Sequence, residues 1–385
     1  MSNNLVSALC WIKKGYAASN PKEFDLQEED IELIKGDPTI QESIKQAQEI
    51  QKQSDKEKKK NIKQQKMEDE WEEQDYEDGD ELDEENYAPV FTSEFGMLKN
   101  GMPQFNDGYD FQIDEISNED KEDYQIQPTD SLMVAAKIEK EFSSLEVYVY
   151  EQDKSSLFVH HEIQLSAFPL ALEWLPLNPL TFENGSAKQG NFVIVGTFLP
   201  EIEFWNLDVL NAIEPSIIMG GEIDQQQMQQ QQMKKGKKVK QFNQSQQLFK
   251  EGSHTDSVLA LNLNGFRQNI LASGSADNTV KIWDISQQKN MHTFKTHTGK
   301  VQVVSWNKAQ EAVLLSGGYD RNIVIQDVRQ PQNAIIHQLQ SEIESGGWCP
   351  YEENILYTST EDGYLISKPT INKLLVYLLI KMSRV

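Results

Sequence analysis

The sequence predicts an all-β protein built from repeated units of four short strands, and three observations lead to this fold class. Beyond residue 129 the chain contains short runs of β-branched and aromatic residues, such as Val280–Trp283 and Ile323–Ile325, separated by Gly, Asn, Asp and Pro. Similar residues recur at a spacing of 43 positions. No helical segments alternate regularly with these runs, which argues against a parallel α/β fold.

The first third of the chain differs in composition from the rest. Residues 1–129 carry 33 acidic and 14 basic side chains, so −19 of the formal net charge of −25 lies there. Such a segment buries too little apolar surface to offset the entropy of ordering. We therefore expect an N-terminal strand within 1–15 and a mostly disordered acidic region at 16–129. Its strongly acidic part, 68–85, could bind a basic partner, and its lysines at 52–66 indicate either a nuclear-localisation signal or a solvated helix face.

Cysteine content and hydropathy exclude several classes of protein. Cys10 and Cys349 are too few for a disulfide framework or a four-cysteine zinc site, which favours a reducing intracellular compartment. The longest apolar run, 374–380, is far shorter than the roughly 20 residues of a membrane span, so no membrane partner is expected. The acidic chain is a poor binder of phosphate backbones in general. Because Thr298–Lys300 lacks the first glycine of a phosphate loop, we expect no nucleotide cofactor. No small-molecule substrate is expected either.

An alignment of the chain with itself defines the repeating unit. An offset of 43 superimposes two complete units, and a further offset of 42 reaches a third, less complete one. The aligned positions are His254 with His297, Ser273 with Ser316, Asp277 with Asp320, and Asp320 with Asp362. We therefore expect WD repeats at 254–296 and 297–339, a degenerate repeat at 340–368, and two older copies within 130–211.

The period, the four strands, the opening His and the closing Trp-Asp resemble a blade of a WD40 β-propeller. This resemblance implies an internal hydrogen-bonded tetrad, which we expect to consist of His254, Ser275, Asp277 and Trp283. Degenerate tetrads are expected at His297 with Asp320, and at Asp362. These roles are structural, because the repeat explains the His, Ser and Asp and no strand-turn-helix nucleophile elbow is present, so we expect no catalytic residues.

Metal binding is not expected either. His160 and His161 are adjacent, and neighbouring residues of a strand point to opposite faces, so the two rings should not share a metal ion. The strand-forming residues suffice for about five blades. Between the second and third blades we expect a disordered insert at 212–253, rich in Gln and then in Lys, whose basic end could contact RNA or the acidic region.

Several segments together resemble the periodic tryptophan protein 1 family of WD40 proteins. They are Ser7–Ile12, Pro128–Leu132, Leu145–Tyr150, Val159–Ile163, Leu172–Trp174, His254–Val258 and Ala276–Val280. The resemblance implies a non-enzymatic scaffold in ribosome biogenesis, acting in rRNA processing and pre-ribosome assembly in the nucleus and nucleolus. Its implied partners are pre-ribosomal assembly factors or ribosomal proteins. The alternative is a chromatin-associated, histone-binding WD40 protein.

The chain departs from this family near its C-terminus. The family would continue through two more blades, whereas here an atypical tail occupies 369–385. We therefore expect a propeller truncated from seven blades. In the complete family the strand at 7–12 would close the ring by pairing with the last blade, so here we expect an open sheet edge and exposed apolar surface.

Overall fold

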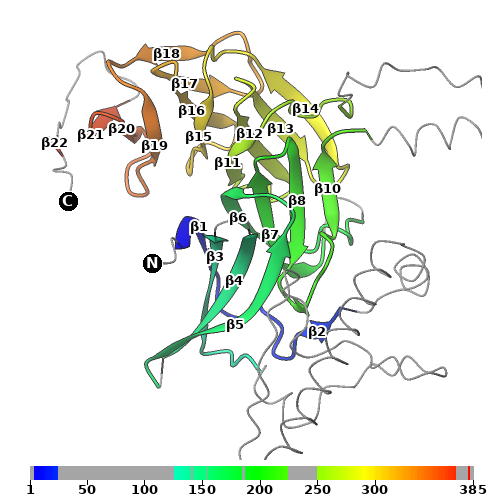
Figure 1. Ribbon diagram of the computed structural model, residues 1–385. Coiled ribbons are helices and arrows are strands. Elements are labelled where there is room, and N and C mark those ends of the chain that lie inside the picture. Colours follow the sequence, from blue (N-terminus) through cyan, green and yellow to red (C-terminus); the bar gives the residue numbers. More distant parts are fainter. Residues whose placement is uncertain are drawn as a thin grey trace, which may run out of the picture. The chain divides into compact units, whose positions relative to one another are not determined.

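The computed structural model describes residues 4–24, 125–139, 142–152, 154–183, 187–223, 249–369 and 380–381. These residues form strands and turns, with no helix among them. The strands assemble into five four-stranded sheets and one two-stranded pair (Figure 1). Five four-stranded blades confirm the all-β propeller prediction. Most of the acidic region, with both of its charged clusters, lies outside the described residues.

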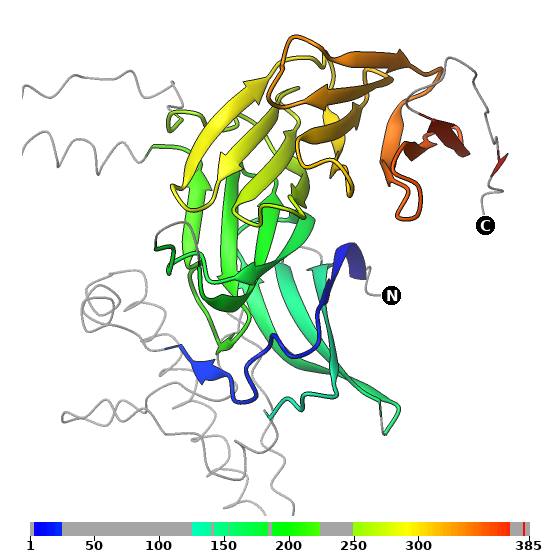
Figure 2. The same ribbon diagram turned by 180° about the vertical axis from the view of Figure 1, so that it is seen from behind.

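The first blade joins two segments that are far apart in the sequence. The N-terminal strand pairs antiparallel with a strand that follows the acidic region, so that Cys10 lies opposite Val134 and Ile12 opposite Leu132. In Figure 2 this blue strand runs beside the cyan strands of the same blade. The sheet consists, in spatial order, of β1 (Asn4–Ile12), β3 (Ser131–Glu139), β4 (Phe142–Glu151) and β5 (Ser156–Leu165).

The expectation that the N-terminal strand pairs with the last blade of a complete ring, and so lacks a partner in this chain, is therefore wrong. The physical reason is the alternation of side chains along β1. Ala8 and Ile12 point to one face and join a core with Val134 and Ala136, so pairing with β3 buries that face. The opposite face carries Trp11, which is 67% exposed.

The second blade extends into the region predicted as an insert. Its strands, in spatial order, are β10 (Ile217–Gly220), β8 (Glu201–Asn206), β7 (Gln189–Thr197) and β6 (Pro169–Leu177). The predicted insert of 212–253 thus begins too early, because β10 is the fourth strand of this blade. Glu222 and Phe249 also form an antiparallel bridge, and the intervening 224–248 lie outside the described residues. A separate parallel pair joins β2 (Lys22–Glu23) to β9 (Val209–Leu210).

The last three blades repeat one pattern of consecutive antiparallel strands. The third contains β11 (Val258–Leu263), β12 (Ile270–Ser275), β13 (Val280–Asp284) and β14 (Lys289–Phe294). The fourth contains β15 (Val301–Trp306), β16 (Val313–Gly318), β17 (Asn322–Asp327) and β18 (Ile335–Gln338). The fifth contains β19 (Ile343–Trp348), β20 (Ile355–Thr360), β21 (Tyr364–Pro369) and β22 (Ile380–Lys381). The predicted atypical tail therefore supplies the fourth strand of this blade.

The hydrophobic cores lie between successive blades. Strands β6, β11, β15 and β19 each pack on the next in chain order, and β1 packs on β6. At the interface of the second and third blades, Ile194 and Phe204 share one buried cluster with Val258, Leu271 and Trp283. Burial of each such side chain contributes about 1.5–3 kcal/mol. Each blade therefore depends on its neighbour for stability.

Two tryptophans add directional links between these blades. Trp306 Nε1 donates a hydrogen bond to the carbonyl oxygen of Asn262 at 3.1 Å, across the third and fourth blades. Trp348 Nε1 donates to the carbonyl oxygen of Ser305 at 3.0 Å, across the fourth and fifth. The periodic recurrence of these tryptophans in the sequence thus corresponds to a repeated contact between blades.

One face of the first blade is apolar and open. Leu5 and Leu9 of β1 are 60% and 57% exposed, beside the exposed Trp11. Among the described residues, no strand of the first blade packs against the fifth as closely as neighbouring blades pack. This agrees with the expectation of exposed apolar surface on the N-terminal strand.

Candidate functional site

A buried polar network lies inside the third blade. His254, just before β11, places its Nε2 atom 2.7 Å from Ser273 Oγ on β12. Trp283 on β13 donates its indole N–H to the same oxygen at 2.8 Å. The other imidazole nitrogen, His254 Nδ1, lies 2.9 Å from the Oδ2 atom of Asp277. The structure therefore brings His254, Asp277 and Trp283 together around Ser273.

The predicted serine of this tetrad, Ser275, is wrong. Its hydroxyl donates to the carbonyl oxygen of Asp256 at 3.0 Å and accepts from the Asp277 backbone N–H at 3.1 Å. Residues two apart on a strand share a face, so spacing alone could not distinguish Ser275 from Ser273. The repeat itself held the signal, because Ser273 aligns with Ser316 whereas Ser275 aligns with a glycine.

The protonation states follow from the direction of these hydrogen bonds. Because the Asp277 carboxylate can only accept, the N–H of a neutral His254 ring lies at Nδ1 and donates to it. The Nε2 atom then accepts from the Ser273 hydroxyl, whose oxygen accepts the Trp283 N–H. Burial lowers the pKa of His254, which favours this neutral ring. Burial alone would raise the pKa of Asp277, but its contacts with His254 and Thr279 outweigh that effect and lower it below its usual value. Each of these four side chains thus has a hydrogen-bond partner within the network.

The fourth blade keeps three of the four members. His297 lies 3.0 Å from Asp320 Oδ2 through Nδ1, and 2.8 Å from Ser316 Oγ through Nε2. The position of the tryptophan is taken by Gln326, whose side-chain amide donates instead to the carbonyl oxygen of Pro331. The serine of this blade is therefore Ser316, which the predicted pair of His297 and Asp320 did not include.

The fifth blade lacks the histidine. At the serine position, the buried Thr358 has a hydroxyl with no hydrogen-bond partner. Asp362 accepts instead from the hydroxyl of Thr360 at 2.5 Å. The opening His is replaced by the buried Leu339, at the offset of 42 residues from His297. This blade is held by strand pairing and apolar packing without the complete network.

The residue after each of these aspartates turns the chain. Asn278, Arg321 and Gly363 all have positive φ angles, of 64°, 66° and 83°. This left-handed conformation is easiest for Gly and is tolerated by Asn, whereas Arg adopts it at a steric cost. The aspartate carboxylate supports the turn by accepting backbone N–H groups, as Asp277 does from Thr279 at 2.9 Å.

The network offers no accessible nucleophile. His254 and Ser273 are both 0% exposed, and every donor of the network is directed at another member. The arrangement can therefore orient and stabilise the blade, but a substrate could not reach the serine hydroxyl.

The histidine pair of the first blade is arranged differently from the prediction. Val147 pairs with His161 and Tyr148 with Val159, so a β-bulge places His160 as an extra residue. The two Nδ1 atoms consequently lie 2.8 Å apart, and the expectation of opposite faces is wrong. Burial, together with the neighbouring ring, lowers the pKa of His161 to about 3. The described part of the chain nevertheless contains no group of three or more His, Cys, Asp or Glu side chains arranged to hold a metal ion.

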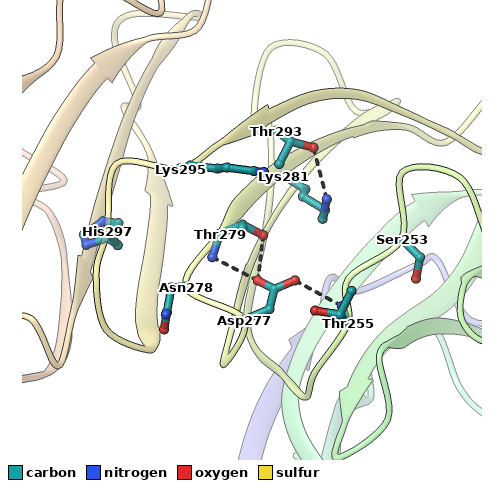
Figure 3. A pocket seen from close by; sticks show the side chains of 9 residues that line it. All are labelled: Ser253, Thr255, Asp277, Asn278, Thr279, Lys281, Thr293, Lys295 and His297. Atoms are coloured by element: carbon teal, nitrogen blue, oxygen red, sulfur yellow. Dashed lines mark hydrogen bonds between the residues drawn. The ribbon is translucent and has the colours of Figure 1, made fainter. Parts of the chain in front are cut away.

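A pocket of about 470 Å³ lies beside the polar network, on the surface of the third blade (Figure 3). Three loop segments line it, one preceding β11, one at the turn between β12 and β13, and one connecting β14 to β15, together with one residue each of β13 and β14. Its lining consists of Ser253, Thr255, Asp277, Asn278, Thr279, Lys281, Thr293, Lys295 and His297. The sequence does not reveal this pocket, because two strands lie between each loop segment and the next and only the closed blade brings the segments together.

No helix within the described ranges is long and apolar enough to cross a membrane.

Five four-stranded blades, with a His-Ser-Asp-Trp network inside the third, define a WD40 β-propeller protein. The WD domain, G-beta repeat family matches residues 245–284 and 288–327. Propellers of this class are typically non-enzymatic scaffolds that mediate protein-protein interactions.

The relatives of the chain are WD-repeat proteins. An uncharacterized WD repeat-containing protein of Schizosaccharomyces pombe is 39% identical over 378 residues, which cover 94% of this chain and 70% of the relative. Periodic tryptophan protein 1 of Saccharomyces cerevisiae is 28% identical over 328 residues, covering 73% of this chain and 55% of the relative. The Drosophila melanogaster periodic tryptophan protein 1 homolog is 28% identical over 293 residues, covering 74% and 56%.

The chain therefore belongs to the WD-repeat family of these proteins, and the predicted resemblance to periodic tryptophan protein 1 is confirmed. It spans about half the length of the two relatives that carry this name.

Proposed function

We propose that this protein is a non-catalytic scaffold in ribosome biogenesis, which binds assembly factors or ribosomal proteins through its propeller surface in the nucleolus. The observation that carries the proposal is the homology to periodic tryptophan protein 1 over most of the chain, combined with blades whose polar residues are committed to internal hydrogen bonds. A role in rRNA processing or pre-ribosome assembly is what membership of that family implies.

The geometry supports binding over catalysis. The His, Ser and Asp side chains that could perform acid-base or nucleophilic chemistry are enclosed in the third and fourth blades. The surface that remains offers loops, a polar pocket and an apolar strand face, which are features that bind other macromolecules. No observation in the described ranges favours the histone-binding alternative.

Sedimentation of the tagged full-length protein tests this proposal. We expect the protein to co-sediment with pre-ribosomal particles and to localise to the nucleolus. After nuclease treatment of the lysate, the protein should move to lighter fractions together with the dissociated particles. Washing at moderately raised salt should release a peripherally bound protein and leave an integral component in place. A protein that sediments on its own and spreads through the cytoplasm would contradict the proposal.

A further inference from the structure

The pocket on the third blade contains two lysines that no carboxylate neutralises by direct contact. Lys281 on β13 is a buried residue, 6% exposed, and its ammonium group donates to Thr293 Oγ1 at 3.0 Å. Lys295, which follows β14, lines the same pocket from the exposed side. Figure 3 shows the two lysine side chains close together on one wall. Neither ammonium group forms an ion pair with any carboxylate of the described residues.

The one acidic residue of the pocket is already fully engaged. Asp277 accepts hydrogen bonds from His254, from the backbone N–H of Thr255 at 3.1 Å, and from both the N–H and the hydroxyl of Thr279. Its carboxylate therefore holds the turn and the network, and it does not reach either lysine. With two lysines and one aspartate, the lining is net positive in an otherwise acidic protein.

Keeping two cations together in a partly buried site is costly without an anion. Burial lowers the pKa of Lys281, the attraction of Asp277 opposes this effect, and the neighbouring charge of Lys295 adds a smaller lowering. An anion placed between the two ammonium groups would relieve this repulsion. Lys281 uses one of its three N–H donors on Thr293, so further donors remain for such a ligand.

We propose that this pocket binds a phosphorylated serine or threonine side chain of a protein partner. A phosphate carries a charge of about −1.5 to −2 near neutral pH, which matches two lysines better than a single carboxylate does. The exposed hydroxyl of Thr255 lines the same space and supplies a further donor to phosphate oxygens, whereas the Thr293 hydroxyl accepts from Lys281 and donates to Asn290 Oδ1 at 3.1 Å. The volume of about 470 Å³ exceeds that of a phosphate group alone, so it admits the side chain that carries it.

The acidic character of the chain argues for a single phosphate on a protein over a polyanion. A net charge of −25 repels nucleic acid and anionic membrane surfaces at long range. A single phosphate in a recess responds mainly to charges within about 10 Å, the screening length at moderate salt, and the pocket lining carries two lysines against one aspartate. The inference rests on the scaffold function proposed above, because it specifies the chemistry by which one partner is held.

Binding of degenerate phosphopeptides tests the inference. The full-length protein is applied to matched arrays of phosphoserine and phosphothreonine peptides, their unphosphorylated forms, and their glutamate-substituted forms. The affinity of each captured peptide is then measured in solution by fluorescence anisotropy. We expect binding of phosphopeptides that weakens as salt is raised and that inorganic phosphate competes. Equal capture of phosphorylated and unphosphorylated peptides, or no capture of either, overturns the inference. Capture of the glutamate peptides at equal affinity also overturns it, in favour of a carboxylate site.

Substitutions locate the binding to the pocket. Lys295→Ala removes an exposed cation and should leave the fold intact, and we expect at least tenfold weaker binding. Lys281→Met keeps the apolar part of the buried side chain and should weaken binding by at least as much, with folding checked by circular dichroism. Lys289→Ala, an exposed lysine on β14 outside the pocket, is the matched control and should bind as the wild type does. Equal losses in Lys295→Ala and Lys289→Ala contradict the assignment.

The same variants separate this inference from the proposed function. If Lys295→Ala and the wild type both fail to bind phosphopeptides yet co-sediment with pre-ribosomal particles, the phosphate site is wrong and the scaffold function stands. If phosphopeptides bind but the protein sediments free, the site is right and the ribosomal function is wrong.

Discussion

Replacing Ser273 with alanine removes the centre of the polar network in the third blade. The Ser273 hydroxyl contacts both the Trp283 N–H, at 2.8 Å, and His254 Nε2, at 2.7 Å, and it is fully buried. Alanine leaves the indole N–H and the imidazole nitrogen without partners. A buried polar group left unsatisfied costs about 1–3 kcal/mol, so the two groups predict a loss of about 2–6 kcal/mol of unfolding free energy.

Urea unfolding followed by circular dichroism measures this loss, with hydrogen exchange of the β12 and β13 amides reporting on the third blade itself. The matched controls are Ser275→Ala and Ser316→Ala. Each should cost less than Ser273→Ala, because no tryptophan donates to either hydroxyl. If Ser273→Ala and Ser275→Ala are equally stable within about 0.5 kcal/mol, the assignment of the central serine from hydrogen-bond geometry is refuted.

Three further substitutions test charge and packing. Burial raises the pKa of Glu173 to about 7, against the lowering effect of its contact with the Leu263 N–H, so the folded protein binds this proton more tightly than the unfolded chain does. The free energy of unfolding should therefore fall by about 2–3 kcal/mol as pH rises from about 4.5 to 7. Glu173→Gln should abolish this pH dependence in urea titrations at a series of pH values. The pH dependence contributed by Asp320 runs in the opposite direction, because burial would raise its pKa but the hydrogen bond with His297 lowers it to about 2. Its contribution of about 2 kcal/mol to the free energy of unfolding is complete above pH 4 and is lost as pH falls towards 2. Acid unfolding of Asp320→Asn should lack this contribution. Gly318→Ser should lower the thermal midpoint, at a cost of about 1–3 kcal/mol, because a Cβ atom there meets a backbone carbonyl oxygen of the preceding loop; an unchanged midpoint would show that this loop moves aside.

The repeat made most of the propeller predictable from sequence. The alignment of His254 with His297 and of Asp277 with Asp320 placed two blades correctly, because the same hydrogen bonds recur at the same spacing. Composition could not locate the edges of the less regular blades. The strand at 217–220 is only four residues long and adjoins a glutamine-rich segment, so its composition places it within the predicted insert.

Pairs of residues that are equivalent by pattern were separated only by the folded chain. Ser273 and Ser275 share a strand face, and only the depth of each hydroxyl relative to Trp283 decides which one bridges the ring and the indole. His160 and His161 are adjacent in sequence, so a regular strand would direct them to opposite faces. An extra residue in the strand pairing, which no local pattern marks, brings the two rings into contact. Such features depend on the register between strands, which is set by the partner strand as much as by the residues themselves.

The sequence by itself determined the fold class, the number of recognisable blades and the WD-repeat family, since these depend on periodic hydrophobic and polar positions that each blade repeats. Only the tertiary structure decided that the N-terminal strand completes the first blade, more than one hundred residues away from its partner, because that pairing rests on which apolar face β1 can bury. The two-lysine pocket likewise exists only where three loops of the third blade meet, since attraction or repulsion between charges depends on their distance in space and not in sequence.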